Sequence, residues 1–245
     1  MSDALVQVLL PVHNEATSIE RTIREIHDEL SPKVPMEFIV CEDGSTDGTQ
    51  EVLASLRAQM PMKLLASTER KGYAQAIIGG FREVRAPWVL VLDSDGQCDP
   101  KDFWAFWSLR DRYDVLLGWR VKRADPWFRR WMSAAFRWLY MRFFDVPVHD
   151  PSCPYLLINK RVLDLLTPEL GRLPQGLWWE FVARAQGHQF TIAEVPVAHR
   201  RRVAGATRVF RPWKIPAIAF RSIRGLLQLR RETAGGKADH GPGAA

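Results

Sequence analysis

Two carboxylates, Asp93 and Asp95, stand one residue apart directly after the apolar run 88–92. If that run is a buried strand, both carboxylates lie at its carboxyl end, where open α/β sheets bind ligands. Two acids held this close repel each other unless a cation neutralises them. Mg²⁺ favours one or two carboxylates together with substrate phosphates. The pair therefore predicts a site for a metal-bridged diphosphate.

Two other polar clusters follow expected strands in the same half of the chain. Residues 11–15 (Pro-Val-His-Asn-Glu) end the first strand, and residues 42–49 (Glu-Asp-Gly-Ser-Thr-Asp-Gly-Thr) follow the second. Either cluster alone is typical of a turn that leads into a helix cap. Because the carboxyl ends of parallel strands meet at one edge of a sheet, all three clusters together favour a ligand site.

The elements that would position these clusters alternate between strand and helix. Strands are expected over 5–12, 36–41, 62–66, 88–92 and 113–118, and helices over 19–30, 52–60, 73–84 and from Asp99-Pro100 onward. This order predicts an α/β fold with a Rossmann-like, mostly parallel sheet and helices on both faces. The second half is less regular, with helices expected over 126–144, from Lys160 and over 178–186, and strands over 155–158 and 190–197.

Several common sites lack their defining residues. A nicotinamide enzyme needs Gly-x-Gly-x-x-Gly in its first turn, and residues 11–15 contain no glycine. Gly79-Gly80 is not followed by Lys-Ser or Lys-Thr, so it is not a P-loop. The three cysteines are widely spaced and form no zinc pattern, which is typical of a reduced cytosolic setting. A bound diphosphate would therefore be held by a metal and by side chains.

The chain shows no signal peptide at its start and no run of about 18 apolar residues. Its net charge of +6 is concentrated in residues 119–142 and 199–231, which indicates an anionic partner. Residues 127–144 and 211–231 combine Trp and Phe with arginines, a pattern typical of helices in a membrane interface. Packing of these aromatics on the domain itself is the alternative. A nucleic-acid partner is not expected, because no recognised nucleic-acid module accompanies the basic residues.

These motifs resemble glycosyltransferase family 2, whose members have the GT-A fold and invert the anomeric centre of a nucleotide-sugar. The resemblance is carried by residues 11–15, 42–49, Lys71-Gly72-Tyr73-Ala74, Gly79-Gly80-Phe81 and 93–97. Three later segments are similar to motifs of the polyprenyl (dolichyl) phosphate sugar synthases: Gly118-Trp119-Arg120, residues 150–155 and residues 202–208. The chain departs from that pattern at His13, Pro154 and Thr207-Arg208, which affects the acceptor more than the donor.

The resemblance implies a donor side made from the first half of the chain. Asp43 would hydrogen-bond the nucleotide base, Pro11 and Glu15 would line the same pocket, and Lys71 would contact substrate. Asp93 and Asp95 would hold Mg²⁺ or Mn²⁺ on the diphosphate, with Gln97 as a further ligand. The metal would offset the charge on the departing nucleoside diphosphate, so Asp95 counts among the catalytic residues.

The resemblance also implies an acceptor side built on arginines. Arg120, Arg129 and the catalytic candidate Arg202 match positions that hold an acceptor phosphate, and Ser133 shares a helix face with Arg129. A phosphate monoester needs little help from a base, because its second pKa is about 6. A hydroxyl acceptor would need a general base. Asp150 is the first candidate for that base and Glu180 the second.

The sequence thus predicts an inverting, metal-dependent hexosyltransferase that uses a GDP- or UDP-sugar and a polyprenyl phosphate. We expect a GT-A domain over 1–210, C-terminal amphipathic helices over 211–232 and a disordered tail over 233–245. The expected location is the cytoplasmic, inner face of a membrane, with a membrane partner subunit as a further hypothesis. The alternatives are a family 2 enzyme with a sugar or lipid hydroxyl as acceptor, and a non-catalytic protein that binds nucleotide-sugar or anionic lipid.

Overall fold

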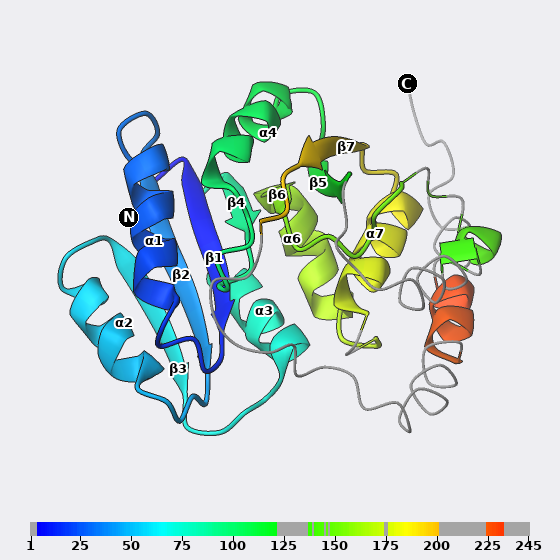
Figure 1. Cartoon of the computed structure of the whole chain (residues 1–245). Helices are drawn as coiled ribbons and strands as arrows, with labels where there is room; N and C mark the ends of the chain where they lie inside the picture. The colour runs from blue at the N-terminus through cyan, green and yellow to red at the C-terminus, as the bar shows by residue number, and fades with distance from the viewer. Residues whose placement is uncertain are drawn as a thin grey trace.

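The protein is described here by a computed structural model (Figure 1). The structure describes residues 4–121, 137–138, 140–144, 146, 148–173, 176–200 and 224–232. Three predicted site residues, Arg129, Ser133 and Arg202, lie outside these ranges, as does the predicted tail 233–245.

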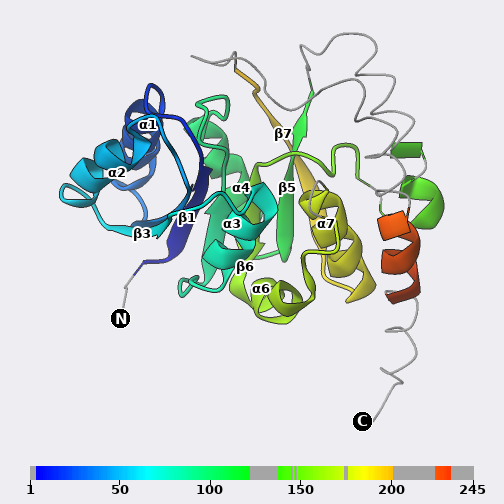
Figure 2. The same cartoon turned by 90° about the horizontal axis from the view of Figure 1, so that it is seen from below.

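A seven-stranded sheet runs through the molecule in the order β3-β2-β1-β4-β6-β5-β7 (Figures 1 and 2). Its strands are β1 (Val6–Val12), β2 (Met36–Asp43), β3 (Met62–Ser67), β4 (Trp88–Val91), β5 (Val115–Arg120), β6 (Leu156–Asn159) and β7 (Ile192–Val197). All neighbours pair in parallel except β6, which is antiparallel to β4 and β5. The expected mostly parallel sheet is confirmed.

Helices lie on both faces of the sheet, as predicted. They are α1 (Ile19–Leu30), α2 (Thr49–Arg57), α3 (Tyr73–Phe81), α4 (Phe103–Leu109), α6 (Lys160–Leu166) and α7 (Leu177–Gly187), with short 3₁₀ turns η1 (Pro100–Asp102) and η2 (Thr167–Glu169). On one face, Trp104 of α4 donates to Glu29 of α1 at 2.7 Å. On the other, α3 lies near α7 (Figure 2), and Phe81 of α3 packs edge-on against Trp178 of α7.

Local chemistry explains where the elements begin. Helix α2 begins at Thr49, three residues before the expected start. Its N-cap is Gly48, and the Asp47 carboxylate just before it accepts from the Thr49 backbone N–H at 3.2 Å. The expected start at Asp99-Pro100 is confirmed as η1, where Asp99 caps the Lys101 N–H at 3.0 Å. Apolar β1 and β4 are fully buried, as strands covered on both faces must be.

A helix over 224–232 packs beside the described helical residues 137–143 (Figures 1 and 2). Leu226 and Leu229 are fully buried, and a Cβ on Gly225 would lie 2.2 Å from Leu173 Cδ2. Part of the predicted amphipathic appendage therefore packs on the α/β domain. Within the described ranges, no helix has both the length and the apolar character needed to span a bilayer.

Glu180, the second candidate for a general base, has a structural position instead. It is fully buried, and its carboxylate accepts from the backbone N–H groups of Gly171, Arg172 and Leu173 at 2.9–3.2 Å. It also pairs with Arg184, which in turn binds Glu232 of the C-terminal helix at 2.7 Å. Glu180 holds this loop and helix together, so it is not placed to take a proton from a substrate.

We predict that Glu180→Gln lowers the free energy of unfolding by about 2–4 kcal/mol. The amide cannot accept all of these bonds and leaves the buried Arg184 with less compensating charge. Denaturant unfolding measures the change. Glu20→Gln, which removes the exposed ion pair with Arg24, is the matched control and should cost less than about 1 kcal/mol. Equal effects of the two substitutions would contradict the structural role.

Candidate active site

The loops after β1 and β2 are bonded to each other at one edge of the sheet. The Asn14 backbone N–H donates to Ser45 Oγ at 2.9 Å, and Asn14 Oδ1 accepts from the Thr46 N–H at 2.8 Å. His13 Nδ1 lies 2.8 Å from the Asp43 carbonyl oxygen. The parallel register of β1 and β2 aligns Val12 with Glu42, which brings the two loops together. The expectation that these polar clusters meet is confirmed.

Asp43 connects this edge to the start of α3. Its buried carboxylate accepts from the backbone N–H groups of Lys71 at 2.6 Å and Gly72 at 2.8 Å. Gly44 permits the close approach, because its φ is +64° and a Cβ there would lie 2.7 Å from the Arg70 nitrogen. A base-binding role for Asp43 stays a prediction, and it would use the lone pairs that these two bonds leave. Its observed effect is to position the loop that carries the exposed Lys71.

Asp93 and Asp95 follow β4 at the same edge, partly exposed. The Tyr73 hydroxyl donates to Asp93 Oδ1 at 3.0 Å, and the Gln97 N–H donates to Asp95 Oδ1 at 3.1 Å. Tyr73 is 40% exposed as a whole, but desolvation around its hydroxyl and the Asp93 charge raise the pKa of Tyr73, so the hydroxyl remains a donor.

The predicted ligands Asp93, Asp95 and Gln97 meet part of what a hard divalent cation requires. Carboxylate and amide oxygens suit Mg²⁺ or Mn²⁺. Among the described residues no group of three or more His, Cys, Asp or Glu could hold a metal ion. A role of Asp93 and Asp95 as metal ligands stays a prediction.

The chain that leaves β7 lies along the acidic loop. Cys98 and His199 form an antiparallel bridge, the Arg200 N–H donates to the Gln97 carbonyl at 2.9 Å, and Gln97 Nε2 donates to the Arg200 carbonyl at 3.1 Å. His199 Nε2 lies 3.3 Å from Gln97 Nε2. The Arg200 guanidinium pairs with Asp99 at 2.8 Å and with Glu25 of α1. This segment therefore places an imidazole and a guanidinium beside the predicted metal site.

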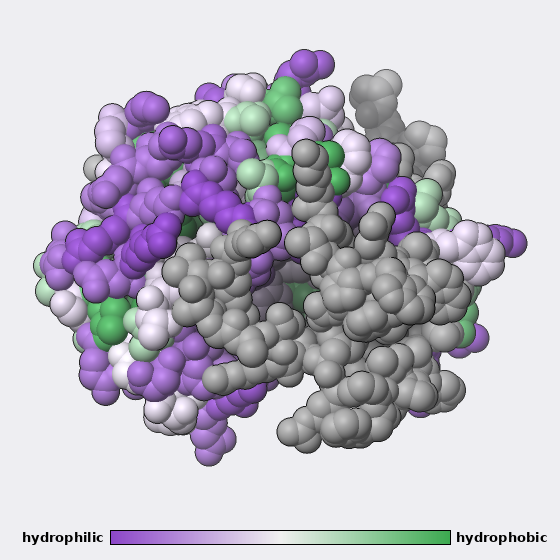
Figure 3. All heavy atoms as spheres, in the orientation of Figure 1, coloured by the Kyte–Doolittle hydropathy of each residue, from purple (hydrophilic) through white to green (hydrophobic). Residues whose placement is uncertain are grey.

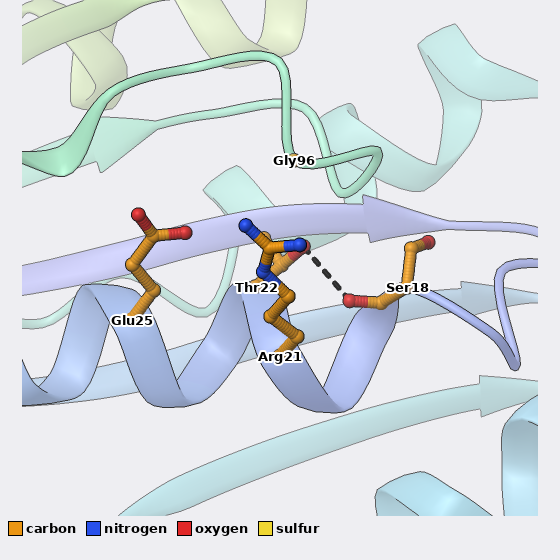
Figure 4. Close-up of a pocket in the computed structure, with 5 residues that line it drawn as sticks. All are labelled: Ser18, Arg21, Thr22, Glu25 and Gly96. Carbon is orange, nitrogen blue, oxygen red and sulfur yellow. Dashed lines mark hydrogen bonds between the residues drawn. The ribbon is translucent and has the colours of Figure 1, made fainter. Parts of the chain in front are cut away.

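A small pocket opens between α1 and the turn at Gly96 (Figure 4). It is lined by Ser18, Arg21, Thr22, Glu25 and Gly96. Thr22 Oγ1 donates to the Ser18 carbonyl at 2.9 Å, so that hydroxyl serves the helix. Gly96 belongs to the acidic loop 93–97, so the pocket borders that loop. Its lining residue Glu25 is the one that pairs with Arg200.

Two predicted acceptor-side residues, Arg120 and Asp150, form a bidentate ion pair. Arg120 Nε and Nη2 donate to the two Asp150 oxygens at 2.7 Å and 3.0 Å, and Nη2 also donates to Ser152 Oγ at 3.0 Å. Burial acts to lower the pKa of Arg120, but its bonds to Asp150 and the charge of that carboxylate raise the pKa overall. Glu194 of β7 accepts from the Asp150 N–H at 2.8 Å and so helps to fix the backbone that carries this ion pair.

Some of these functional candidates were missed from the sequence. Tyr73 lies inside the Lys-Gly-Tyr-Ala motif but was given no role, and neither Glu194 nor His199 was considered. Only Tyr73 and His199 had a usable signal in the sequence, since Tyr73 is part of a recognised motif and His199 lies three residues before the segment 202–208. Pro11 and Glu15, which were predicted to line the nucleotide pocket, have these surroundings in the structure: Pro11 is buried in β1, and Glu15 Oε2 accepts from Ser18 Oγ at 2.7 Å. Their role in binding stays a prediction.

The cysteines are not nucleophiles in this structure. Burial, followed by a smaller effect of Glu83, raises the pKa of the Cys41 thiol to about 12. Burial also raises the pKa of Cys153 to about 12, and burial followed by the Asp93 charge raises that of Cys98. All three are free thiols that stay protonated near neutral pH.

Residues 7–166 match the model of the family described as glycosyl transferase family 2. The chain belongs to this family. The match spans β1 through α6 and includes all three polar loops at the sheet edge. The resemblance stated from the motifs is confirmed.

Curated relatives include an undecaprenyl-phosphate 4-deoxy-4-formamido-L-arabinose transferase of Pseudomonas aeruginosa (strain LESB58). It is 26% identical over 208 residues, which are 83% of this chain and 60% of the relative. The protein of that name from Edwardsiella ictaluri (strain 93-146) is 30% identical over 152 residues, 60% of this chain and 47% of the relative. The chain thus spans about 60% or less of the length of these family 2 relatives.

Solved structures confirm the GT-A fold. Glucosyl-3-phosphoglycerate synthase from Mycobacterium tuberculosis, in complex with Mn²⁺, UDP-Glc and phosphoglyceric acid, has a TM-score of 0.67 at 19% identity, covering 93% of this chain and 80% of that one. A mannosyltransferase from Pyrobaculum calidifontis, in complex with GDP-Man and Mn²⁺, has a TM-score of 0.62 at 18% identity, covering 98% and 76%.

We predict that Arg120→Met lowers the free energy of unfolding by about 3–5 kcal/mol, because it removes the bidentate ion pair with the Asp150 carboxylate, which is 5% exposed. Chemical denaturation measures the loss. Lys160→Met removes an i,i+4 pair with the exposed Asp164 and should cost less than about 1 kcal/mol. A loss no larger than that of Lys160→Met would show that the buried ion pair does not stabilise the fold.

Proposed function

We propose that this family 2 protein is an inverting, metal-dependent transferase that moves a hexose from a GDP- or UDP-sugar to a polyprenyl phosphate. The observation that carries the proposal is the meeting of Asp43 and Asp93 at one edge of the parallel sheet, where both accept hydrogen bonds from the start of α3 and Asp95 follows two residues after Asp93. The structures with a similar fold were solved with Mn²⁺ and either UDP-Glc or GDP-Man, which supports a nucleotide-sugar donor.

On the donor side, Asp93, Asp95 and Gln97 would hold Mg²⁺ or Mn²⁺ against the diphosphate. Such an ion supplies charge stabilisation for the departing nucleoside diphosphate. The protein's own residues would position the donor: Asp43 holds the 71–72 loop, and the loop after β1 is bonded to the loop after β2.

On the acceptor side, the pairing of Asp150 favours a phosphate over a hydroxyl. Both Asp150 oxygens already accept from Arg120, so taking a proton from a hydroxyl would disrupt a buried ion pair. A phosphate that is mostly ionised near neutral pH needs no base. It needs cations, and Arg120 presents a further nitrogen, Nη1, beyond the two that bind Asp150. The names of the curated relatives also specify undecaprenyl phosphate.

In the proposed reaction a phosphate oxygen of the acceptor attacks the anomeric carbon from the face opposite the diphosphate. The new C–O bond forms as the bond to the donor phosphate breaks, and the electron pair leaves with the nucleoside diphosphate. Attack from the opposite face inverts the configuration. Arg120 and, as a prediction, Arg129 and Arg202 would hold the acceptor phosphate for this attack.

The test is transfer of labelled sugar from GDP- and UDP-sugars, with Mn²⁺, to a short polyprenyl phosphate and to the matching free polyprenol. We expect labelled product from the phosphate and none from the alcohol. Asp95→Asn should lower the rate by roughly 100-fold or more while the fold is retained, since one lost electrostatic contact costs about 3–4 kcal/mol. Labelling of the alcohol alone, or full activity of Asp95→Asn, would overturn the proposal.

We also propose that the enzyme works as a peripheral protein on the inner face of a membrane, where a polyprenyl acceptor resides. Three large apolar side chains are exposed on the adjacent helical segments 137–143 and 224–232: Trp138 at 71%, Met141 at 47% and Leu227 at 44%. Arg230 lies over the Phe143 ring at 5.5 Å, which joins the two segments.

The arginines on the same two segments also support a membrane contact at this surface. Exposed arginines on these segments are Arg142, Arg224, Arg230 and Arg231. Each basic residue near an anionic leaflet contributes roughly 1 kcal/mol. The side formed by α1 and α2 is mostly hydrophilic (Figure 3). A membrane partner subunit stays a hypothesis.

We predict that the protein co-sediments with anionic vesicles at low salt and that Trp138→Ala with Leu227→Ala weakens binding by at least about fivefold, because both side chains would insert into the interface. Leu165→Ala on α6 is the matched control, since Leu165 is also 44% exposed. It should leave binding unchanged. Equal binding by the double variant and the control would reject this surface as the membrane contact.

A further inference from the structure

Tyr73, at the first position of α3, joins the predicted metal carboxylate to α7. Its hydroxyl lies 3.0 Å from Asp93 Oδ1 and 3.1 Å from the indole nitrogen of Trp178. The indole N–H can only donate, and an ionised carboxylate can only accept. The Tyr73 oxygen therefore accepts from Trp178, and its proton is directed at Asp93. The direction of both hydrogen bonds follows from the chemistry of the two neighbours.

The hydroxyl is held in place from both sides. Trp178 is buried and packs edge-on against Phe81 and Phe181, with ring centroids 6.3 Å and 6.1 Å away. The backbone just before Tyr73 is bonded to Asp43 through the Lys71 and Gly72 N–H groups. Trp178 and the backbone before Tyr73 cannot move without breaking these contacts, so the hydroxyl donates to Asp93 from a fixed position.

We infer that Tyr73 is a positioning residue for the metal site, which orients the Asp93 carboxylate toward the cation and the donor diphosphate. The inference rests on the proposed function and adds a residue to it. Groups that hydrogen-bond a metal ligand fix its orientation, and their removal typically weakens metal affinity by about 10–100-fold. Without the hydroxyl, Asp93 loses one of the bonds that fix its orientation, and binding of the cation must then supply that restriction. The same chain links the site to α7, whose Arg184 binds the C-terminal helix.

The test is the affinity of the full-length protein for Mn²⁺, measured by electron paramagnetic resonance in the presence of UDP or GDP. We expect Tyr73→Phe to weaken Mn²⁺ binding by roughly 10-fold, since it removes only the hydroxyl. Asp93→Asn should abolish the binding. Tyr113→Phe is the matched control: Tyr113 precedes β5, which runs parallel to β4, so this ring lies at the opposite edge of the sheet. It should bind Mn²⁺ like the wild type.

A second measurement separates orientation of Asp93 from general support of α3. Nucleotide affinity without metal depends on the Asp43 side of the site, so Tyr73→Phe should leave it within about twofold of wild type. A parallel loss of metal-free nucleotide affinity would show that the hydroxyl merely holds α3 in place and would overturn the inference.

Unchanged Mn²⁺ affinity in Tyr73→Phe, with loss in Asp93→Asn, would also overturn it while leaving the proposed function standing. Absence of Mn²⁺ binding in the wild type would instead reject the proposed function, and Tyr73's role with it.

Discussion

Carboxylates of like charge meet at one edge of the sheet in this protein, and the rest of the site is arranged around them. The parallel register of β1, β2 and β4 brings Asp43 and Asp93 to the same edge. Like charges in partly desolvated surroundings are unfavourable unless each has a compensating partner. Asp43 is compensated by two backbone N–H groups and Asp93 by the Tyr73 hydroxyl. The start of α3 is therefore the element that supplies hydrogen-bond donors to two of the carboxylates at this edge.

Buried charges in the second half of the molecule are compensated in a different way, by forks between arginine and carboxylate. Arg120 binds both oxygens of Asp150, and Arg184 binds Glu180 and Glu232. Such pairs stabilise little relative to an apolar core, but they are costly to break, so they specify which segments lie together. The first pair joins β5 to the segment before β6. The second joins α7 to the C-terminal helix. Both places carry residues assigned to the acceptor or to the membrane contact.

Much of the fold could be predicted because its signals are local. Apolar runs such as 88–92 mark buried strands, and the spacing of Ile19, Ile23 and Ile26 marks α1. The antiparallel insertion of β6 between β4 and β5 had no such signal, since its direction depends on where the chain re-enters the sheet. Glu180 was misjudged for a similar reason. Nothing in its neighbourhood along the chain shows that it would meet the N–H groups of residues 171–173.

The sequence by itself determined the family, the order of strands and helices and the identity of the acidic motifs, because each of these depends on short runs of neighbouring residues. Only the tertiary structure decided which partners those motifs have. Tyr73 with Asp93, Arg120 with Asp150 and Glu194 with the Asp150 backbone are separated by 20 to 44 positions along the chain. Their pairing depends on strand register and on burial, which raises the cost of any charge left without a partner. These long-range contacts are set by the packed fold, and they determine which of the acids can work as a ligand and which is already held in an ion pair.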